Sequence, residues 1–151
     1  KVGDVYYVSA PYGQFKFDIN GSKKVLFIAG GTGLAPFFSM LRLALNMNVK
    51  LDCVILYSVK YPYDIIEKEE MDVLKEKLGL KIIVTVTRPA PGDGWAGDTG
   101  HIDANMIKKY APDFIERASY ICGPPAFTKA CKDALVGLGI DEHSIKAEMW
   151  G

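Results

Sequence analysis

The sequence has no long apolar run and no excess of charge of either sign. No stretch approaches the roughly 20 consecutive apolar residues that a membrane-spanning helix needs. Lysine plus arginine and aspartate plus glutamate both number 18, so the formal net charge is zero. A neutral chain lacks the basic surface that binds nucleic acid or an anionic membrane. We therefore expect neither a membrane span nor a nucleic-acid partner.

Cysteine is also scarce, with only Cys53, Cys122 and Cys131 in 151 residues. Their odd number, their scatter and the absence of a C-x-x-C motif exclude a disulfide framework and a zinc or iron–sulfur site. We expect no metal and a reducing compartment such as the cytoplasm. Apolar residues make up 49% and charged residues 24%, which is typical of a globular domain with its own core.

Apolar, β-branched segments alternate with helix-like segments along most of the chain. The expected strands are residues 24–28, 51–57, 80–87, 118–122 and 145–150. The expected helices are residues 33–46, 63–78, 103–110 and 125–138, the third with Asp103 as its N-cap and the last followed by a turn that Asp141 caps. This alternation predicts an α/β fold, a doubly wound five-stranded parallel sheet with strand order 3-2-1-4-5. Ligands of such sheets bind across the carboxyl ends of the strands.

The first twenty residues do not follow this alternation. Residues 4–10 have the period of a strand, and residues 15–17 form a second short candidate, separated by proline and glycine. We expect them to form a short N-terminal antiparallel β remnant of a separate unit. The chain begins with Lys1 rather than methionine, which agrees with a piece of a longer protein.

A glycine turn, Gly30-Gly31-Thr32-Gly33, follows the first strand. Glycines let the backbone approach an anion closely, and a helix N-terminus directs free N–H groups towards it. Thr32 adds a hydroxyl donor. A tight strand-to-helix turn without a ligand would have the same sequence, so the turn alone leaves both interpretations open.

The second and third strands end in polar residues. Dinucleotide folds that prefer NAD place an acid after the second strand, where this chain has Ser58 and Lys60. A hydroxyl and a cation suit the 2′-phosphate of NADP, although a solvated loop is the alternative. Asp64 could still bind a ribose. Arg88, after the third strand, is either a phosphate ligand or simply exposed.

The fourth and fifth strands end in Cys122-Gly123-Pro124 and in Glu148 and Trp150. A cysteine at such a strand end is usually a small packing residue. No histidine is placed to activate it, and the sequence has neither a G-x-S-x-G elbow nor a P-loop lysine. A cysteine- or serine-nucleophile hydrolase is therefore excluded.

Together these segments resemble the NAD(P)-binding domain of the ferredoxin–NADP reductase superfamily, the flavin-dependent reductases. The matching stretches are AGGTGLAP, YSVKYPYDIIEKEEM, the glycine–tryptophan loop TRPAPGDGWAGDTGHI, YICGPPAF and the final EMW. The resemblance covers nearly the whole chain, in the family's order and spacing. Lys60 stands where members that use NADP typically have arginine, which keeps the charge but loses the fork of donors.

The resemblance implies a role for each residue. Gly30, Gly31, Thr32 and Gly33 would hold the pyrophosphate, and Ser58, Lys60 and Arg88 the adenosine end. Cys122, Gly123 and Pro124 would lie under the nicotinamide, with Glu148 near the site of hydride transfer and Trp150 near the flavin. The implied cofactors are NADP or NAD, with NADPH favoured, and FAD.

The resemblance also implies a division of the chain. Residues 1–20 would be the C-terminal remnant of an FAD-binding β-barrel, with Ala10 in place of the usual glycine, and residues 21–151 the NAD(P)-binding domain. The barrel's R-x-Y-S/T motif does not occur in the sequence, so most of the FAD site lies outside it. We expect hydride transfer from NAD(P)H to FAD on the longer protein, electron transfer to an unidentified acceptor, and no activity from this chain alone. A non-catalytic nucleotide-binding or electron-transfer docking subunit is the alternative.

Overall fold

One six-stranded parallel sheet organises the chain, with the strand order β4-β3-β2-β1-β5-β6. A computed structural model describes residues 1–9 and 13–150. The strands are β1 (Lys24–Gly30), β2 (Asp52–Val59), β3 (Lys81–Val86), β4 (Asp98–Thr99), β5 (Ala118–Gly123) and β6 (Lys146–Met149). The helices are α1 (Ala35–Asn46), α2 (Lys68–Leu78), α3 (Ala104–Tyr110) and α4 (Pro125–Gly137), with short 3-10 turns η1 (Gly31–Leu34), η2 (Pro62–Asp64), η3 (Phe114–Glu116) and η4 (Glu142–Ser144).

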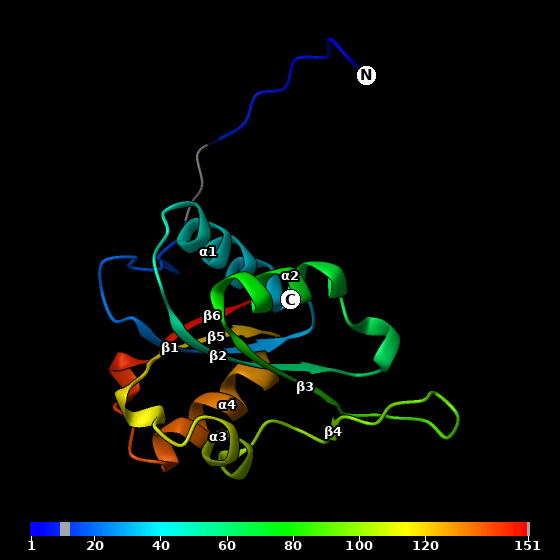
Figure 1. The fold of residues 1–151 in the computed structure, drawn as a ribbon, viewed down its shortest axis with the longest axis vertical. Helices are drawn as coiled ribbons and strands as arrows, with labels where there is room; N and C mark the ends of the chain where they lie inside the picture. Colours follow the sequence, from blue (N-terminus) through cyan, green and yellow to red (C-terminus); the bar gives the residue numbers. More distant parts are fainter. Residues whose placement is uncertain (10–12, 151) are drawn as a thin grey trace.

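The helices cover both faces of the sheet. Helices α1 and α2 lie on one face and α3 and α4 on the other, so the molecule has three layers (Figure 1). The central strand β1 is buried from Val25 to Gly30, because it faces helices on both sides. Two apolar clusters, one on each face, form the core.

The sequence predicted most of these elements. The five predicted strands correspond to β1, β2, β3, β5 and β6, and they lie side by side in the predicted order. The predicted caps are also present: the Asp103 carboxylate accepts the amide of Met106, and the Asp141 carboxylate accepts the amide of His143.

The predicted count of five strands is wrong by one. Strand β4 lies within the stretch expected to be a loop, and it pairs with the outer edge of β3 through Thr85–Asp98 and Val86–Thr99. Two polar residues among glycines have no strand pattern of their own. They form a strand because β3 leaves its outer edge open to hydrogen bonding.

The predicted helix at residues 63–78 is too long at its start. Pro62–Asp64 is a separate 3-10 turn, and α2 begins only at Lys68. Glu67, at its N-cap, has a φ of 50° in the left-handed region, which interrupts any helix. The amphipathic pattern continued through this break, so periodicity alone did not reveal it.

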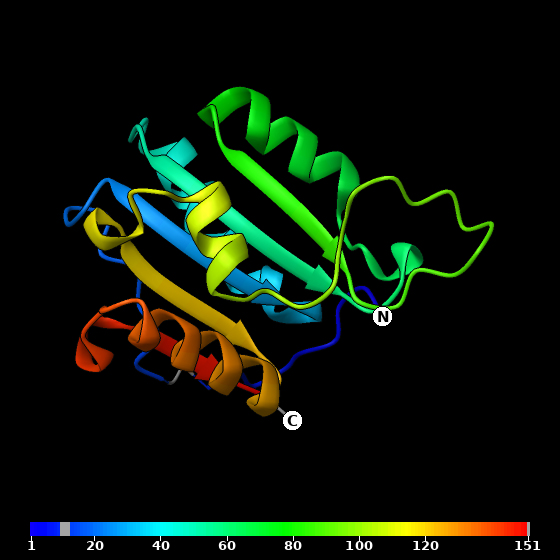
Figure 2. The ribbon, with the colours of Figure 1, turned by 90° about the horizontal axis from the view of Figure 1, so that it is seen from below.

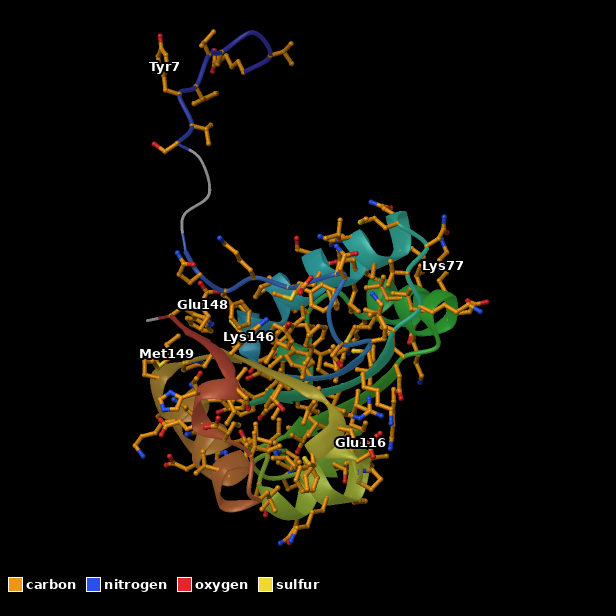
Figure 3. All side chains as sticks on the ribbon, turned by 90° about the vertical axis from the view of Figure 1, so that its left-hand side faces the viewer. Tyr7, Lys77, Glu116, Lys146, Glu148 and Met149 are labelled. Atoms are coloured by element: carbon orange, nitrogen blue, oxygen red, sulfur yellow. The ribbon has the colours of Figure 1, made fainter. Side chains whose placement is uncertain are left out.

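The predicted N-terminal β remnant is wrong for the described residues. Residues 4–9 and 15–17 form no strand, and residues 10–12 lie outside the described part. Val5, Tyr6, Tyr7 and Val8 are all exposed, and this segment extends away from the sheet, with Tyr7 far from β6 (Figure 3). A strand needs a neighbouring strand to share its hydrogen bonds, and none pairs with these residues.

The segment that follows packs firmly on the domain. Phe15 contacts Phe37 and Tyr120, and Phe17 contacts Phe27 and Tyr120, at ring-centroid distances of 5.9–6.0 Å. Phe27 and Phe37 stack at 4.4 Å with an angle of 8° between the rings. This aromatic cluster fixes residues 15–17 against the face of the sheet that α1 covers.

Candidate functional site

The carboxyl ends of the strands converge on one edge of the sheet, where the strand arrows end together (Figure 2). The pairing places Ser58 beside Gly30, Ala29 beside Cys122, and Cys122 beside Glu148. Residues expected in the site thus form a row across the sheet. From β3 to β6 this row spans four strand spacings, roughly 19 Å.

The glycine turn contacts the cysteine strand end directly. A Cβ added at Gly33 would lie 2.2 Å from the carbonyl oxygen of Cys122 and 3.0 Å from the amide nitrogen of Gly123. Gly33 is therefore required for close packing of η1 against β5. Gly31, at φ 56°, adopts a conformation that favours glycine, and Thr32 is exposed at the tip of the turn.

Gly30 and Gly123 share a different neighbour, the ring of Phe127. A Cβ added at Gly30 would lie 2.7 Å from this ring, and one added at Gly123 would lie 2.6 Å from it. The Gly123 Cβ position is also only 3.2 Å from the Cα of Gly30. The absence of a side chain at these two glycines therefore lets β1, β5 and the start of α4 pack closely together. It also leaves space for any ligand that approaches the backbone.

Trp150 closes one side of the same group. Its amide donates a hydrogen bond to the carbonyl of Gly123 at 3.4 Å, and its ring lies 4.0 Å from the Cβ position of Gly31. The side chain is 42% exposed. A half-exposed indole beside two glycine turns can cover, or give way to, a flat ligand ring.

Cys122 is buried, and burial together with the nearby Glu148 carboxylate raises the pKa of its thiol to about 11. The thiol is therefore neutral near pH 7, whereas a nucleophilic cysteine reacts as the thiolate. This agrees with the exclusion of a cysteine nucleophile. Pro124, which follows Gly123, carries the chain directly into α4.

The adenosine end expected from the sequence lies after β2 and β3. Ser58 is 6% exposed at the end of β2, whereas Lys60 and Arg88 are exposed. The amide of Arg88 donates to the carbonyl of Lys60 at 2.8 Å, so the two cations start from adjacent backbone. Ser58 therefore offers a ligand little accessible surface, whereas the two cations are open to solvent.

The loop after Lys60 is well ordered by its own contacts. The amide of Tyr61 donates to the carboxylate of Asp64 at 3.1 Å, and the Tyr57 hydroxyl accepts the amide of Ile66 at 3.4 Å. The rings of Tyr61 and Tyr63 stack at 5.1 Å. Asp64 is thus engaged in capping η2, which weakens its case as a ribose ligand.

An open hollow of about 320 Å³ lies beside β6. Gln14, Phe15, Lys146, Ala147 and Glu148 line it, and Lys146 and Glu148 lie near one another on the β6 edge (Figure 3). The Lys146 ammonium lies 3.1 Å from the Tyr120 hydroxyl. Gln14 was not expected here from the sequence, because it belongs to the segment that precedes the sheet.

The long loop after β3 is held by Trp95 and Asp98. The Trp95 indole N–H donates to the carbonyl of Asp98 at 2.9 Å, so this tryptophan anchors the loop. The Asp98 carboxylate accepts from the Tyr110 hydroxyl and from Lys109, and these hydrogen bonds lower the pKa of Asp98. β4 is therefore tied to α3 on the opposite side from β6.

The structure brings the expected residues together in two groups. Gly30, Gly31, Thr32, Gly33, Cys122, Gly123, Pro124, Glu148 and Trp150 surround the junction of β1, β5 and β6. Ser58, Lys60 and Arg88 lie towards β2 and β3. Within the described residues, no cluster of three or more histidine, cysteine, aspartate or glutamate side chains is arranged to bind a metal. None of the helices described is both long and apolar enough to cross a bilayer.

Phe127 is the main neighbour of these residues that the sequence did not indicate. Its only signal was an aromatic residue two positions after Pro-Pro in YICGPPAF. Nothing in that pattern shows that the ring reaches Gly30, because the two residues are far apart in the chain.

Comparison with known proteins supports the same assignment. Residues 27–133 match the family model described as the oxidoreductase NAD-binding domain. The chain is 33% identical over 152 residues to the glycine betaine monooxygenase reductase subunit of Pseudomonas aeruginosa, covering all of this chain and 42% of that protein. It is 32% identical to NADH-cytochrome b5 reductase 1 of Mortierella alpina, covering 93% of this chain and 48% of that one.

Solved structures agree in fold. The cytochrome b5 reductase domain of Ulva prolifera nitrate reductase superposes with a TM-score of 0.74 at 30% identity, over 83% of this chain and 50% of that one. The FAD/NAD-binding domain of nitric oxide dioxygenase from Vibrio cholerae gives a TM-score of 0.79 at 24% identity, over 94% and 56%. The chain spans about half the length of the relatives it matches, or less.

Proposed function

The chain belongs to the oxidoreductase NAD-binding domain family, and from this premise we propose that it is the NAD(P)H-binding half of a flavin-dependent reductase. The resemblance to the ferredoxin–NADP reductase superfamily is confirmed by the family match and by the related reductases. In the proposed protein, an FAD-binding domain of the same polypeptide, of which residues 1–20 are the last part, receives hydride from the coenzyme bound along residues 21–151.

The observation that carries the proposal is the continuous row at the carboxyl edge. It has a glycine turn that begins a helix at its centre, exposed cations towards β3 and a half-exposed indole towards β6. A dinucleotide has a matching distribution of groups, with phosphates between a ribose end and a flat aromatic end. The open backbone at Gly31 fits a phosphate, because the first amides of a helix have no partner within it.

In the proposed complex, each residue group has one task. Gly30, Gly31, Thr32 and Gly33 hold the pyrophosphate through backbone amides and one hydroxyl. Ser58, Lys60 and Arg88 hold the adenosine end. Cys122, Gly123 and Pro124 form the surface under the nicotinamide, where the neutral thiol of Cys122 adds no charge that would hinder hydride transfer.

Glu148 and Trp150 lie where the nicotinamide and the flavin would meet. The Glu148 carboxylate, beside Cys122, would stabilise positive charge on a nicotinamide bound at this junction. The Trp150 ring lies 4.0 Å from the Cβ position of Gly31, so it would have to turn aside for a nicotinamide to occupy this junction. The coenzyme and FAD supply the redox chemistry, and these residues supply position and electrostatics.

The test uses the full-length protein with its natural preceding sequence. We expect a yellow, flavin-loaded product that oxidises NADPH or NADH with ferricyanide as acceptor. A colourless full-length product that binds the coenzyme but catalyses no oxidation would contradict a reductase and support the docking subunit instead. The named relatives serve different acceptors, so we propose that the acceptor is selected outside this domain.

Coenzyme choice gives a sharper test at Lys60. Because its ammonium would pair with the 2′-phosphate, Lys60→Ala should weaken NADPH binding about tenfold, the loss of roughly one charge-assisted hydrogen bond, and leave NADH binding unchanged. Titration of both coenzymes by fluorescence measures this. Lys77→Ala is the matched control, since Lys77 is an exposed lysine at the far end of α2 (Figure 3). Equal loss for both coenzymes would refute selection for NADP by Lys60.

A further inference from the structure

Phe127 connects the two halves of the site. Its ring occupies the space where a side chain at Gly30 or at Gly123 would stand, at 2.7 Å and 2.6 Å from the two Cβ positions. Gly30 begins the phosphate turn, and Gly123 lies in the turn beneath the proposed nicotinamide position. The ring is thus in contact with both turns where Gly30 and Gly123 lie side by side.

The position of this ring is fixed from the α4 side. Phe127 lies in the first turn of α4, which starts at the tip of β5 (Figure 2). The buried Thr128 next to it donates its hydroxyl to the carbonyl of Gly123 at 3.1 Å and its amide to the carbonyl of Pro124 at 2.9 Å. These two hydrogen bonds hold the start of α4, and with it Phe127, at a set place relative to Gly123.

The same edge of the ring, at Cδ1 and Cε1, faces both Gly30 and Gly123. Because neither glycine carries a side chain, this ring edge packs on both backbones at once, where the Gly123 Cβ position is only 3.2 Å from the Cα of Gly30, and so holds the two turns relative to one another. We propose that Phe127 is a positioning residue that sets the spacing between the pyrophosphate turn and the nicotinamide turn, so that one dinucleotide fits both. This inference rests on the proposed function, since it assigns a binding task to each turn.

The spacing matters for a ligand that spans both turns and for no shorter one. Once one half of a dinucleotide is bound, the other half binds at an effective concentration that depends on how well the two subsites are spaced. A displacement of about 1 Å between subsites can cost as much as 100-fold in a positioned reaction. Either half of the dinucleotide contacts only its own turn, so its affinity does not depend on the distance between the two turns.

The experiment compares whole and half ligands on the full-length protein. Dissociation constants are measured for NADPH, for 2′-phospho-ADP and for reduced nicotinamide mononucleotide, with wild type and Phe127→Leu. We expect Phe127→Leu to weaken NADPH binding about tenfold and to change either half less than about twofold. The rate of flavin reduction by NADPH in stopped flow should fall at least in proportion.

The control separates spacing from general packing. Phe114→Leu makes the same change in the same apolar cluster, on η3 and away from the site. It should lower the melting temperature without altering the ratio of whole-ligand to half-ligand affinity. Should Phe127→Leu not fold, Phe127→Met gives the same comparison with a longer side chain.

Two results would overturn the inference. An unchanged ratio in the Phe127 variant, or equal weakening of NADPH and of both halves, would reduce Phe127 to a packing residue. Wild type that binds neither half nor NADPH would refute the proposed function itself and this inference with it. If wild type binds both halves, the proposed function stands, and an unchanged ratio then contradicts only the role of Phe127.

Discussion

At the scale of single residues, the position most sensitive to change is Gly33. Any side chain there would meet the carbonyl of Cys122 at 2.2 Å, and backbone cannot rotate aside as a flexible side chain can. We expect Gly33→Ala to lower the free energy of unfolding by about 1–3 kcal/mol and to weaken coenzyme binding, because η1 must shift. Urea unfolding and coenzyme titration measure the two effects.

A glycine elsewhere provides the contrast for that substitution. Gly137 lies in the last turn of α4, and a Cβ added there would meet nothing within 4 Å. Gly137→Ala should therefore stabilise the protein by about 0.5–1 kcal/mol, because alanine loses less backbone entropy in a helix. If both substitutions had the same sign, close packing at Gly33 would not be the cause.

At the scale of elements, Arg117 joins three of them. Its side chain is 7% exposed and donates to Asp113, the N-cap of η3, at 2.7 and 3.0 Å, and to Asp52 on β2 at 2.9 Å. It also donates to the carbonyl of Val25 on β1 at 3.4 Å. These hydrogen bonds lower the pKa of Asp113. Arg117→Met should cost about 2–3 kcal/mol, because it removes charge-assisted hydrogen bonds from a buried guanidinium and leaves Asp113 with only Lys24 as a charged partner among the described residues.

A second arginine shows how much of that cost comes from burial. Arg42 pairs with Glu70 between α1 and α2, and its side chain is 55% exposed. Arg42→Met should change the free energy of unfolding by less than about 1 kcal/mol. Comparable losses for the two variants in chemical denaturation would contradict the role assigned to Arg117.

Strands buried on both faces were predictable from the sequence. Elements whose existence or limits depend on contacts with other segments, or on the conformation of one residue, were not. Strands β1 and β2 are long apolar runs, so their place in a parallel sheet follows from composition. β4 depends on the open edge of β3, and the break before α2 depends on the backbone of Glu67. The exposed residues 4–9 have a strand pattern but no partner strand in the described chain.

The site was predictable to the same degree. Carboxyl ends of parallel strands share one edge, so Ser58, Cys122 and Glu148 were expected near the glycine turn. The contact of Phe127 with Gly30 depends on distances between segments that are remote in the chain. No local pattern encodes such a contact, which is why it came only from the structure.

At the scale of the whole molecule, three buried thiols link stability to pH. Burial raises the pKa of Cys122 to about 11 and of Cys131 to about 12, and it raises that of Cys53 further. The thiols of the unfolded chain titrate near pH 8.5. Below that pH they are protonated in both states, so the free energy of unfolding is at its full value. Above it they ionise only in the unfolded chain, so the free energy of unfolding falls as pH rises. Between pH 9 and 10 each thiol should lower the free energy of unfolding by about 1.4 kcal/mol per pH unit.

Urea unfolding at pH 7, 9 and 10 measures this slope. The Cys131→Ala variant should show a shallower slope, because one of the three thiols no longer titrates on unfolding. A free energy of unfolding that stays constant from pH 7 to 10 would show that the thiols ionise as easily in the folded protein as in the unfolded chain.

The neighbourhood of β1 and β5 has a consequence for how the protein forms. The two strands pair from Val25–Ala118 to Ala29–Cys122, although β2, β3, β4 and the helices α1, α2 and α3 lie between them in the chain. Such a long-range pairing closes late and slowly, because a large loop must be ordered first. During synthesis the glycine turn at residues 30–33 therefore emerges well before β5, the strand it packs on, so under the proposed function we expect a growing chain to bind the coenzyme only once β5 has left the ribosome.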